Sequence, residues 1–142
     1  MGTVEYQGLA HIARELEFFR SFNGAQLEKV LSHIECAMYD RGETIFKKGD
    51  PPNAFYIVYE GRVRIHLGYR FLGLMSRIAH LKAGDPFGER ALMENRMHAG
   101  TATAEEPTKL FVLQQSDFDK LIHNDPEFAD LIHFVVERRK PK

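Results

Sequence analysis

The segment from Phe87 to Thr101 holds the residues of this chain whose types and spacing best suit ligand chemistry. Gly88 and Glu89 open a short apolar turn, so free backbone N–H groups and one carboxylate are expected side by side. Amides at the start of a helix attract an anion such as a phosphate, and a carboxylate accepts a hydrogen bond from a sugar hydroxyl. The sequence therefore predicts a site for a ligand that carries both groups.

Each residue of this segment has an expected role, and some have a simpler alternative. Glu89 would accept from the sugar, or it is an exposed turn carboxylate. The backbone N–H groups of Arg90, Ala91 and Leu92 would face the phosphate, although Leu92 also suits core packing. Ala99 is small enough to leave a pocket open. The candidate ligand-binding residues are Phe87, Gly88, Glu89, Arg90, Ala91, Leu92, Arg96, His98 and Ala99.

The sequence contains no complete catalytic or metal-binding motif of the kinds considered next. The glycines at 68 and 73 have the spacing of a phosphate-binding loop, but Leu74 and Met75 follow where lysine and a hydroxyl residue are required. The chain has no Gly-x-Ser-x-Gly turn, and its seven histidines include no H-x-H pair. We therefore expect no enzyme and no metal, and a metal-dependent barrel enzyme is the least favoured class.

The composition favours a globular cytoplasmic protein. The chain has 142 residues, a hydrophobic content of 44% and a net charge of −1, so no basic excess exists to bind nucleic acid. No apolar run has the length of a membrane span, and the N-terminus lacks a signal-peptide core. The single cysteine, Cys36, cannot form an internal disulfide and is expected to be a buried small hydrophobe.

Helices are expected before residue 36. Residues 9–35 have a helical pattern, in which apolar residues recur at helical spacing from Leu27 to Ile34. Asn23 is the expected N-cap of this stretch, with Gln26 three positions later. A less regular helix is expected around Leu9–Phe19.

From Cys36 onward, turn residues alternate with short β-prone runs. Val63, Ile65 and Leu67 alternate with polar residues, which is typical of a strand with one buried face. Runs at roughly ten-residue spacing predict about eight strands in a barrel or jelly roll. The predicted strands include 44–46, 55–59, 63–67, 75–81, 100–104 and 109–114.

Helices return after residue 114. Ser116 is expected to cap one helix, with Asp119 at its third position. Asp125 is expected to cap a second helix that begins at Pro126. The apolar stripe of the second helix comprises Phe128, Leu131, Ile132, Val135 and Val136. A stripe of this width needs cover from the rest of the protein or from a partner.

The predicted fold class is mainly β with flanking helices, a double-stranded β-helix or jelly-roll-like β-roll. The chain shows no internal repeat, low-complexity segment or linker, so residues 1–142 are expected to form a single domain. Within it, 1–35 would form N-terminal helices, 36–114 the β-roll with the candidate segment 87–101, and 115–139 the C-terminal helices.

The candidate segment resembles the phosphate-binding cassette of the cyclic nucleotide-binding domain family, the sensor module of the catabolite activator protein and of protein kinase A regulatory subunits. Four further stretches follow the family's order over roughly residues 20–139, namely Arg41–Asp50, Phe55–Arg64, Leu81–Glu89 and Phe118–Glu127. The resemblance implies a β-roll flanked by helices, cyclic AMP or cyclic GMP as ligand, and a regulatory role in which binding moves the last helix.

The chain departs from the family at His98, where the family carries the arginine that grips the cyclic phosphate. Arginine is always charged and holds two oxygens, whereas histidine is mostly neutral near pH 7. Losing one charged hydrogen bond costs about 1.5–3 kcal/mol. Arg96 either supplies the missing charge or is a solvated loop residue. Three alternatives stay open: a weakened cyclic nucleotide site, a site rebuilt on Arg96, or a site that has lost this ligand.

The expected function is a regulatory, non-catalytic module that binds a cyclic nucleotide and moves its C-terminal helix. The alternative is a degenerate domain of the same fold that serves as a protein-interaction or dimerisation module. Expected partners are the cyclic nucleotide and, through the C-terminal helix, a second copy or an effector protein. No cofactor, direct nucleic-acid partner or membrane is expected, and the chain is either stand-alone or a fragment.

Overall fold

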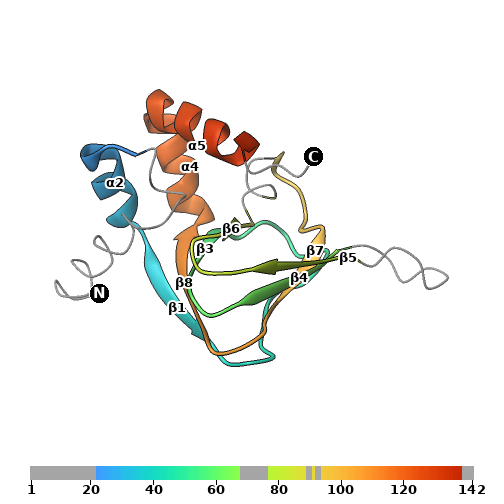
Figure 1. Cartoon of the computed structure of the whole chain (residues 1–142). Coiled ribbons are helices and arrows are strands. Elements are labelled where there is room, and N and C mark those ends of the chain that lie inside the picture. Colours follow the sequence, from blue (N-terminus) through green and yellow to red (C-terminus); the bar gives the residue numbers. More distant parts are fainter. Residues whose placement is uncertain (1–21, 68–76, 89–90, 92–93, 139–142) are drawn as a thin grey trace.

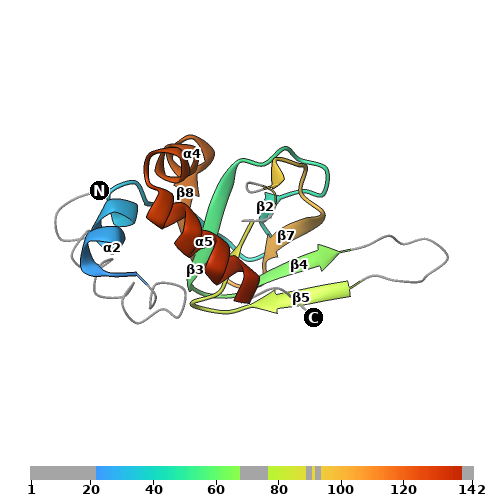
Figure 2. The same ribbon diagram turned by 90° about the horizontal axis from the view of Figure 1, so that it is seen from above.

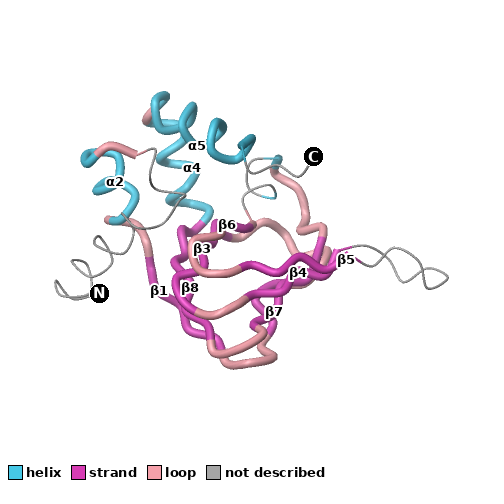
Figure 3. Tube along the Cα trace, viewed as in Figure 1, coloured by secondary structure: helices cyan, strands magenta, loops and turns pink. Residues whose placement is uncertain are grey.

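The computed structural model describes residues 22–67, 77–88, 91 and 94–138, in which three helices gather over one side of a β-roll (Figure 1). Colouring by secondary structure separates the helical layer from the strands (Figure 3). The helices are α2 (Gly24–Leu31), α4 (Gln115–Asn124) and α5 (Pro126–Arg138). The strands are β1 (Glu35–Tyr39), β2 (Thr44–Phe46), β3 (Ala54–Glu60), β4 (Val63–Leu67), β5 (Arg77–Leu81), β6 (Pro86–Phe87), β7 (Gly100–Ala104) and β8 (Thr108–Gln114).

The strands form two four-stranded antiparallel sheets. The first sheet has the order β1-β8-β3-β6 and the second has the order β2-β7-β4-β5. Apart from β4 and β5, the neighbours in each sheet are not consecutive in the chain: Tyr56 of β3 pairs with Val112 of β8, and Ile65 of β4 pairs with Ala102 of β7. The expected β-roll with flanking helices is therefore confirmed.

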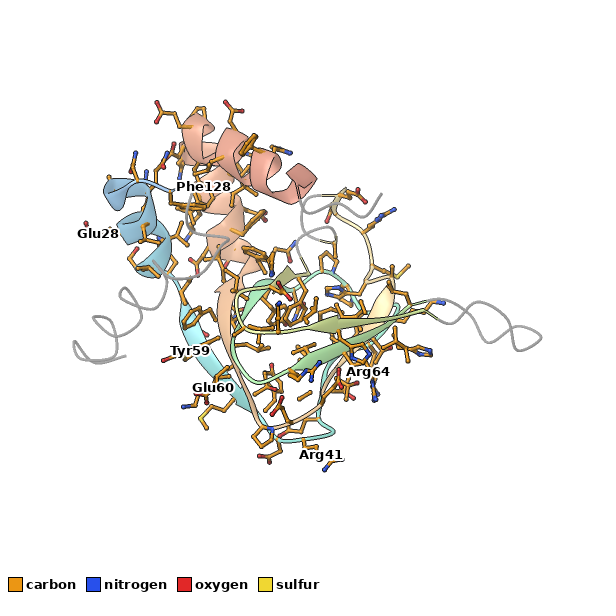
Figure 4. All side chains as sticks on the ribbon, in the orientation of Figure 1. Glu28, Arg41, Tyr59, Glu60, Arg64 and Phe128 are labelled. Atoms are coloured by element: carbon orange, nitrogen blue, oxygen red, sulfur yellow. The ribbon has the colours of Figure 1, made fainter. Side chains whose placement is uncertain are left out.

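A cluster of large apolar side chains, the helix-side cluster, joins the helices to the first sheet. Phe128 is a member of this cluster and lies among the helices, far from Arg41 at the opposite end of the molecule (Figure 4). Its ring packs edge-on against Phe22, with 6.0 Å between the centroids. The members are Phe22, Leu27, Val30, Leu31, Ile34, Phe55, Ile57, Phe111, Leu113, Phe118, Leu121, Phe128 and Ile132. Figure 2, seen from above, shows α5 running diagonally across the helical side of the molecule.

A second cluster fills the space between the two sheets. Because side chains alternate across a strand, neighbouring residues of β8 serve different clusters. Leu110 and Val112 point into the roll, whereas Phe111 and Leu113 face the helices. The buried members of this inner cluster are Phe46, Ala54, Tyr56, Val58, Val63, Phe87, Ala102, Leu110 and Val112.

The two predicted caps that rest on local pairs are confirmed. The Asn23 side chain accepts from the Gln26 backbone, and the Gln26 side chain accepts from the Asn23 backbone, which completes a capping box. Asp125 Oδ1 accepts from the Phe128 N–H at 3.0 Å, and Pro126 is the first residue of α5.

Three local expectations were wrong. The helix of residues 24–31 ends at Leu31 rather than at 35, because a turn follows and Ile34 is buried by packing outside the helix. Ser116 lies inside α4, whose N-cap is Gln114 and has no side-chain cap hydrogen bond. Cys36 is exposed, because β1 is an edge strand and its outward residues have a neighbouring strand on only one side.

Several expectations are left as they were. The helix expected around 9–19, the stretch 68–76 and the first two residues of the strand expected at 75–81 lie outside the described residues. The side chains of Val135 and Val136 also lie outside them, whereas Phe128 and Ile132 are buried and Leu131 is partly buried. The single-domain organisation over 1–142 stays a prediction.

Candidate ligand pocket

A cavity of about 250 Å³ opens beside the candidate segment, between the second sheet and residues 86–100. Its volume is near the lower end of the range of about 300–1,000 Å³ that is usual for small-molecule sites. Most of its lining is apolar. The lining residues are Phe46, Ile65, Leu67, Ala79, Leu81, Pro86, Phe87, Gly88, Ala91, Arg96, Met97, His98, Ala99 and Gly100.

The beginning of the segment is held tightly against β3. Phe87 is buried, pairs with Tyr56 in the sheet, and stacks on its ring with 5.0 Å between the centroids. Gly88 has a φ of +84°, and a Cβ there would lie 3.0 Å from the Ala54 carbonyl oxygen. A side chain at this position would therefore be strained by its backbone conformation and crowded against β3. Gly88 keeps the chain close to the sheet at the point where the cassette begins.

At the end of the segment, Ala99 is exposed to the pocket, whereas Gly100 is packed tightly against β4. Ala99 is exposed at the pocket, as its expected role requires. At Gly100, a Cβ would come within 2.8 Å of the His66 carbonyl oxygen and 2.7 Å of the Leu67 side chain. Gly100 is therefore needed for the close pairing of β7 with β4.

His98 is buried, with 5% of its surface exposed. Its ring stacks on Phe46 with 3.7 Å between the centroids and 10° between the planes. The His98 backbone is bound on both sides to a neighbouring turn: its N–H donates to the Asp50 carbonyl at 2.8 Å, and its carbonyl accepts from the Gly49 N–H at 2.9 Å. The turn and the stacking partner fix the position of the imidazole at the pocket wall.

The imidazole has a polar partner inside the protein. His98 Nε2 lies 3.1 Å from Asn53 Oδ1, and Asn53 Nδ2 donates to Tyr56 Oη at 2.8 Å. Burial lowers the pKa of His98 below its ordinary value, and the nearby negative charge of Asp50 opposes this only in part. The neutral imidazole is therefore favoured, and position 98 lacks the permanent charge that an arginine would give there.

Arg96 lines the same pocket, but its guanidinium is paired. Arg96 Nη2 lies 2.6 Å from Glu94 Oε2, and 60% of the Arg96 side chain is exposed. Its backbone N–H donates to the Ala91 carbonyl at 3.0 Å and ends the short turn of the cassette. Arg96 is therefore a solvated, ion-paired side chain at the edge of the pocket, and its supply of charge to a ligand stays a prediction.

The structure brings together the described members of the predicted set. Phe87, Gly88, Ala91, Arg96, His98 and Ala99 all line the pocket. Glu89, Arg90 and Leu92 lie outside the described residues, and the expected sugar contact and all three expected amide contacts stay predictions.

Sequence reasoning missed the far wall of the pocket and the partner of His98. Ile65 and Leu67 of β4 and Ala79 and Leu81 of β5 line the cavity from strands distant in the chain. The alternation along 63–67 did mark Ile65 and Leu67 as inward residues, and this signal could have identified them as candidates for the pocket lining. Asn53 had no such signal, because its contact with His98 spans 45 residues of sequence.

The described part of the chain holds neither a cluster of metal ligands nor a membrane-spanning helix. No group of three or more His, Cys, Asp or Glu residues there could hold a metal ion. None of the helices described is both long and apolar enough to cross a membrane.

The known proteins that this chain resembles share one type of domain. A family model described as the cyclic nucleotide-binding domain matches residues 37–125. The cyclic AMP receptor protein of Thermus thermophilus is 34% identical over 124 residues, covering 83% of this chain and 56% of that protein. A cAMP-dependent protein kinase regulatory subunit of Colletotrichum orbiculare is 29% identical over 109 residues, covering 77% of this chain and 27% of that protein.

A solved structure agrees with these sequence matches. The crystal structure of the Thermus thermophilus catabolite activator protein superposes with a TM-score of 0.74 at 31% identity, covering 86% of this chain and 57% of that one. The chain thus spans between about a quarter and somewhat more than half of the relatives named here. On the family match, the sequence relatives and the shared β-roll, the chain belongs to the cyclic nucleotide-binding domain family.

Proposed function

We propose that this chain is a regulatory, non-catalytic sensor that binds cyclic AMP or cyclic GMP weakly in the pocket beside residues 87–100. The observation that supports this most is the pocket itself, which is lined by the described residues of the cassette. Family membership makes a cyclic nucleotide the first ligand to test.

The distribution of polar groups suggests how the ligand would lie. The sugar and phosphate would lie along the cassette, where Glu89 would accept from the ribose and backbone N–H groups would face the phosphate. The base would lie against Ile65, Leu67 and Leu81, which make the apolar part of the wall. This orientation pairs the charged end of the nucleotide with donors and leaves the flat base in apolar surroundings.

The weakness of binding follows from His98. A neutral, buried imidazole offers one N–H, and in this structure Asn53 takes the hydrogen bond at Nε2. An anionic ligand would favour the protonated form of His98, and the protonated form would favour the ligand. Because burial lowers the pKa of His98 in the ligand-free chain, binding should strengthen toward acid pH and be strongest below that lowered value.

Signalling would pass through the C-terminal helices to a partner in the cytoplasm. Helix α4 follows β8 without a loop, and α5 buries Phe128 and Ile132 in the helix-side cluster. A change in the roll on binding would therefore alter the packing of α5 against the helix-side cluster. The partner would be a second copy of the chain or an effector protein.

Calorimetric titration with cyclic AMP and cyclic GMP tests the proposal. The wild-type chain should bind at least one of them, and Glu89→Ala should bind it about tenfold to a hundredfold more weakly, because a charged hydrogen bond of about 1.5–3 kcal/mol is lost. Glu106→Ala, which removes an exposed carboxylate from the β7–β8 turn, is the matched control. No heat with either nucleotide would contradict the proposal.

The second candidate function is a degenerate domain that acts as an interaction or dimerisation module. It is favoured because the two described side chains that could bind the phosphate are already paired within the protein. Arg96 is paired with Glu94, and His98 is hydrogen-bonded to Asn53. Sedimentation velocity of the ligand-free chain, compared with Phe134→Ser on the exposed part of α5, tests it. A dimer that the substitution weakens would support this function, and monomers in both samples would contradict it.

A further inference from the structure

Asn53 lies directly before β3 and makes two side-chain hydrogen bonds at once. Its Nδ2 donates to Tyr56 Oη at 2.8 Å, and its Oδ1 lies 3.1 Å from His98 Nε2. An amide oxygen can only accept, so His98 Nε2 must carry the proton. Asn53 therefore selects the Nε2–H form of the neutral imidazole.

The backbone of the same residue holds the start of a helix. The Asn53 carbonyl accepts from the Gln115 N–H at 3.0 Å, one position beyond the sheet pair formed by Ala54 and Gln114. Gln115 is the first residue of α4, and α4 has no side-chain cap. Because the first N–H groups of a helix have no partner inside the helix, this carbonyl satisfies one of them.

The imidazole has little freedom to move independently of Asn53. Phe46 covers one ring face, and the His98 backbone is bound to both Gly49 and Asp50. A ligand at the pocket that turns or protonates the ring therefore changes the hydrogen bond at Nε2. A changed hydrogen bond at Nε2 would shift Asn53, whose carbonyl is bonded to the first turn of α4.

We infer that Asn53 is a positioning residue that fixes the orientation of His98 and transmits a change at His98 to the start of α4. The inference deepens the proposed function and rests on it in one respect: a ligand is the natural cause of the change at His98. Acid pH is a second cause that needs no ligand, and it allows a separate test.

The charged and titratable groups around His98 define that test. Asp50 favours the protonated ring, and Arg96 from the pocket wall is paired with Glu94. Tyr56 is neutral throughout the relevant range because burial raises the pKa of its phenol. His98 is therefore the group of this network whose ordinary pKa lies near neutrality, and it is the group that the titration follows.

The first experiment follows the ligand-free full chain by NMR from pH 8 to pH 5, reading the imidazole nitrogens of His98 and the amide of Gln115. In the wild type, His98 should be the Nε2–H tautomer at pH 8, and the Gln115 amide should shift with the apparent pKa of His98. In Asn53→Ala, His98 should still titrate, but the pH-dependent shift of Gln115 should be lost.

Two further variants separate positioning from a general effect on the fold. Asn53→Asp keeps an accepting oxygen for His98 Nε2, so it should restore the shift of Gln115 and raise the pKa of His98. Asn124→Ala, an exposed asparagine at the end of α4, should behave as the wild type. A Gln115 shift that persists in Asn53→Ala, or an Nδ1–H tautomer in the wild type, would overturn the inference.

The second experiment adds cyclic AMP at pH 8 and observes the same amide. A shift of Gln115 in the wild type that is lost in Asn53→Ala supports the inference, and an equal shift in both overturns it. If calorimetry shows no binding of either cyclic nucleotide, the proposed function fails while the pH titration alone decides the role of Asn53.

Discussion

The helix-side cluster packs on the first sheet, whereas the ligand pocket is lined by the second sheet and the segment from β6 to β7, and the two regions differ in the size of their residues. Every member of the helix-side cluster is a Phe, Leu, Ile or Val. The pocket lining instead includes three alanines, at 79, 91 and 99, and two glycines, at 88 and 100. Large side chains close one region, and small ones leave room in the other, so the two regions are suited to stability and to binding respectively.

The two regions also differ in polarity. The helix-side cluster is made entirely of apolar residues, whereas the pocket wall contains the buried ring of His98. A buried polar group needs a partner, and Asn53 supplies one for His98. Substitutions in the first region should therefore act on the free energy of unfolding, and those in the second should act on ligand affinity.

Phe128→Ala should have the largest effect on stability. The ring is 1% exposed and packs against Phe22, so its loss leaves a cavity and should cost about 3–5 kcal/mol of unfolding free energy. Urea denaturation measures this. Phe134→Ala, at a position 55% exposed on the same helix, is the control and should cost far less. Equal losses in both variants would remove the distinction between the two regions.

Ala99→Leu should reverse the character of the pocket by filling it. The larger side chain would occupy the mouth of the cavity, so calorimetry should show cyclic nucleotide binding weakened at least about tenfold, or about 1.4 kcal/mol. Thermal unfolding should be almost unchanged, because Ala99 is exposed. Ala25→Leu on the exposed side of α2 is the matched control. Unchanged affinity in Ala99→Leu would place the ligand elsewhere.

The pH dependence of stability should carry a smaller contribution from His98. Because burial lowers its pKa in the folded chain, the unfolded chain binds the proton first as the pH falls below about 6.5. The stability from neutral His98 is thus complete above about pH 6.5 and decreases as the pH falls toward the lowered value. His98→Gln should flatten this part of the pH profile in urea unfolding, and a profile identical to that of the wild type would contradict the assignment.

Arg96→Ala should have the smallest effect. The guanidinium is exposed and paired with Glu94, and exposed pairs contribute about 0–1 kcal/mol. We expect a melting temperature close to that of the wild type and an affinity lowered less than about threefold. A complete loss of nucleotide binding would instead show that the site is rebuilt on Arg96.

The elements that the sequence predicted well are those set by local spacing. The cap of α2 needs only Asn23 and Gln26, and the first turn of α5 needs only Asp125 and Pro126. Both signals lie within a few residues, so they could be recognised without knowledge of the fold. The strand at 63–67 was predictable for the same reason, from its two-residue alternation.

What the sequence did not predict depends on contacts between distant segments. The exposure of Cys36 follows from the edge position of β1, which only the sheet order reveals. The start of α4 one residue before Ser116 follows from the Asn53 carbonyl, which accepts from Gln115. The burial of His98 and its bond to Asn53 likewise arise from packing between distant segments.

Calorimetric titration of the wild type and of His98→Arg with cyclic AMP and cyclic GMP, at pH 6 and pH 8, tests the central claim most directly. The claim is that this pocket is a cyclic nucleotide site weakened by a mostly neutral His98. It predicts weak binding by the wild type that is tighter at pH 6, and binding by His98→Arg at least about tenfold tighter and nearly independent of pH. No binding of either nucleotide by His98→Arg would contradict it.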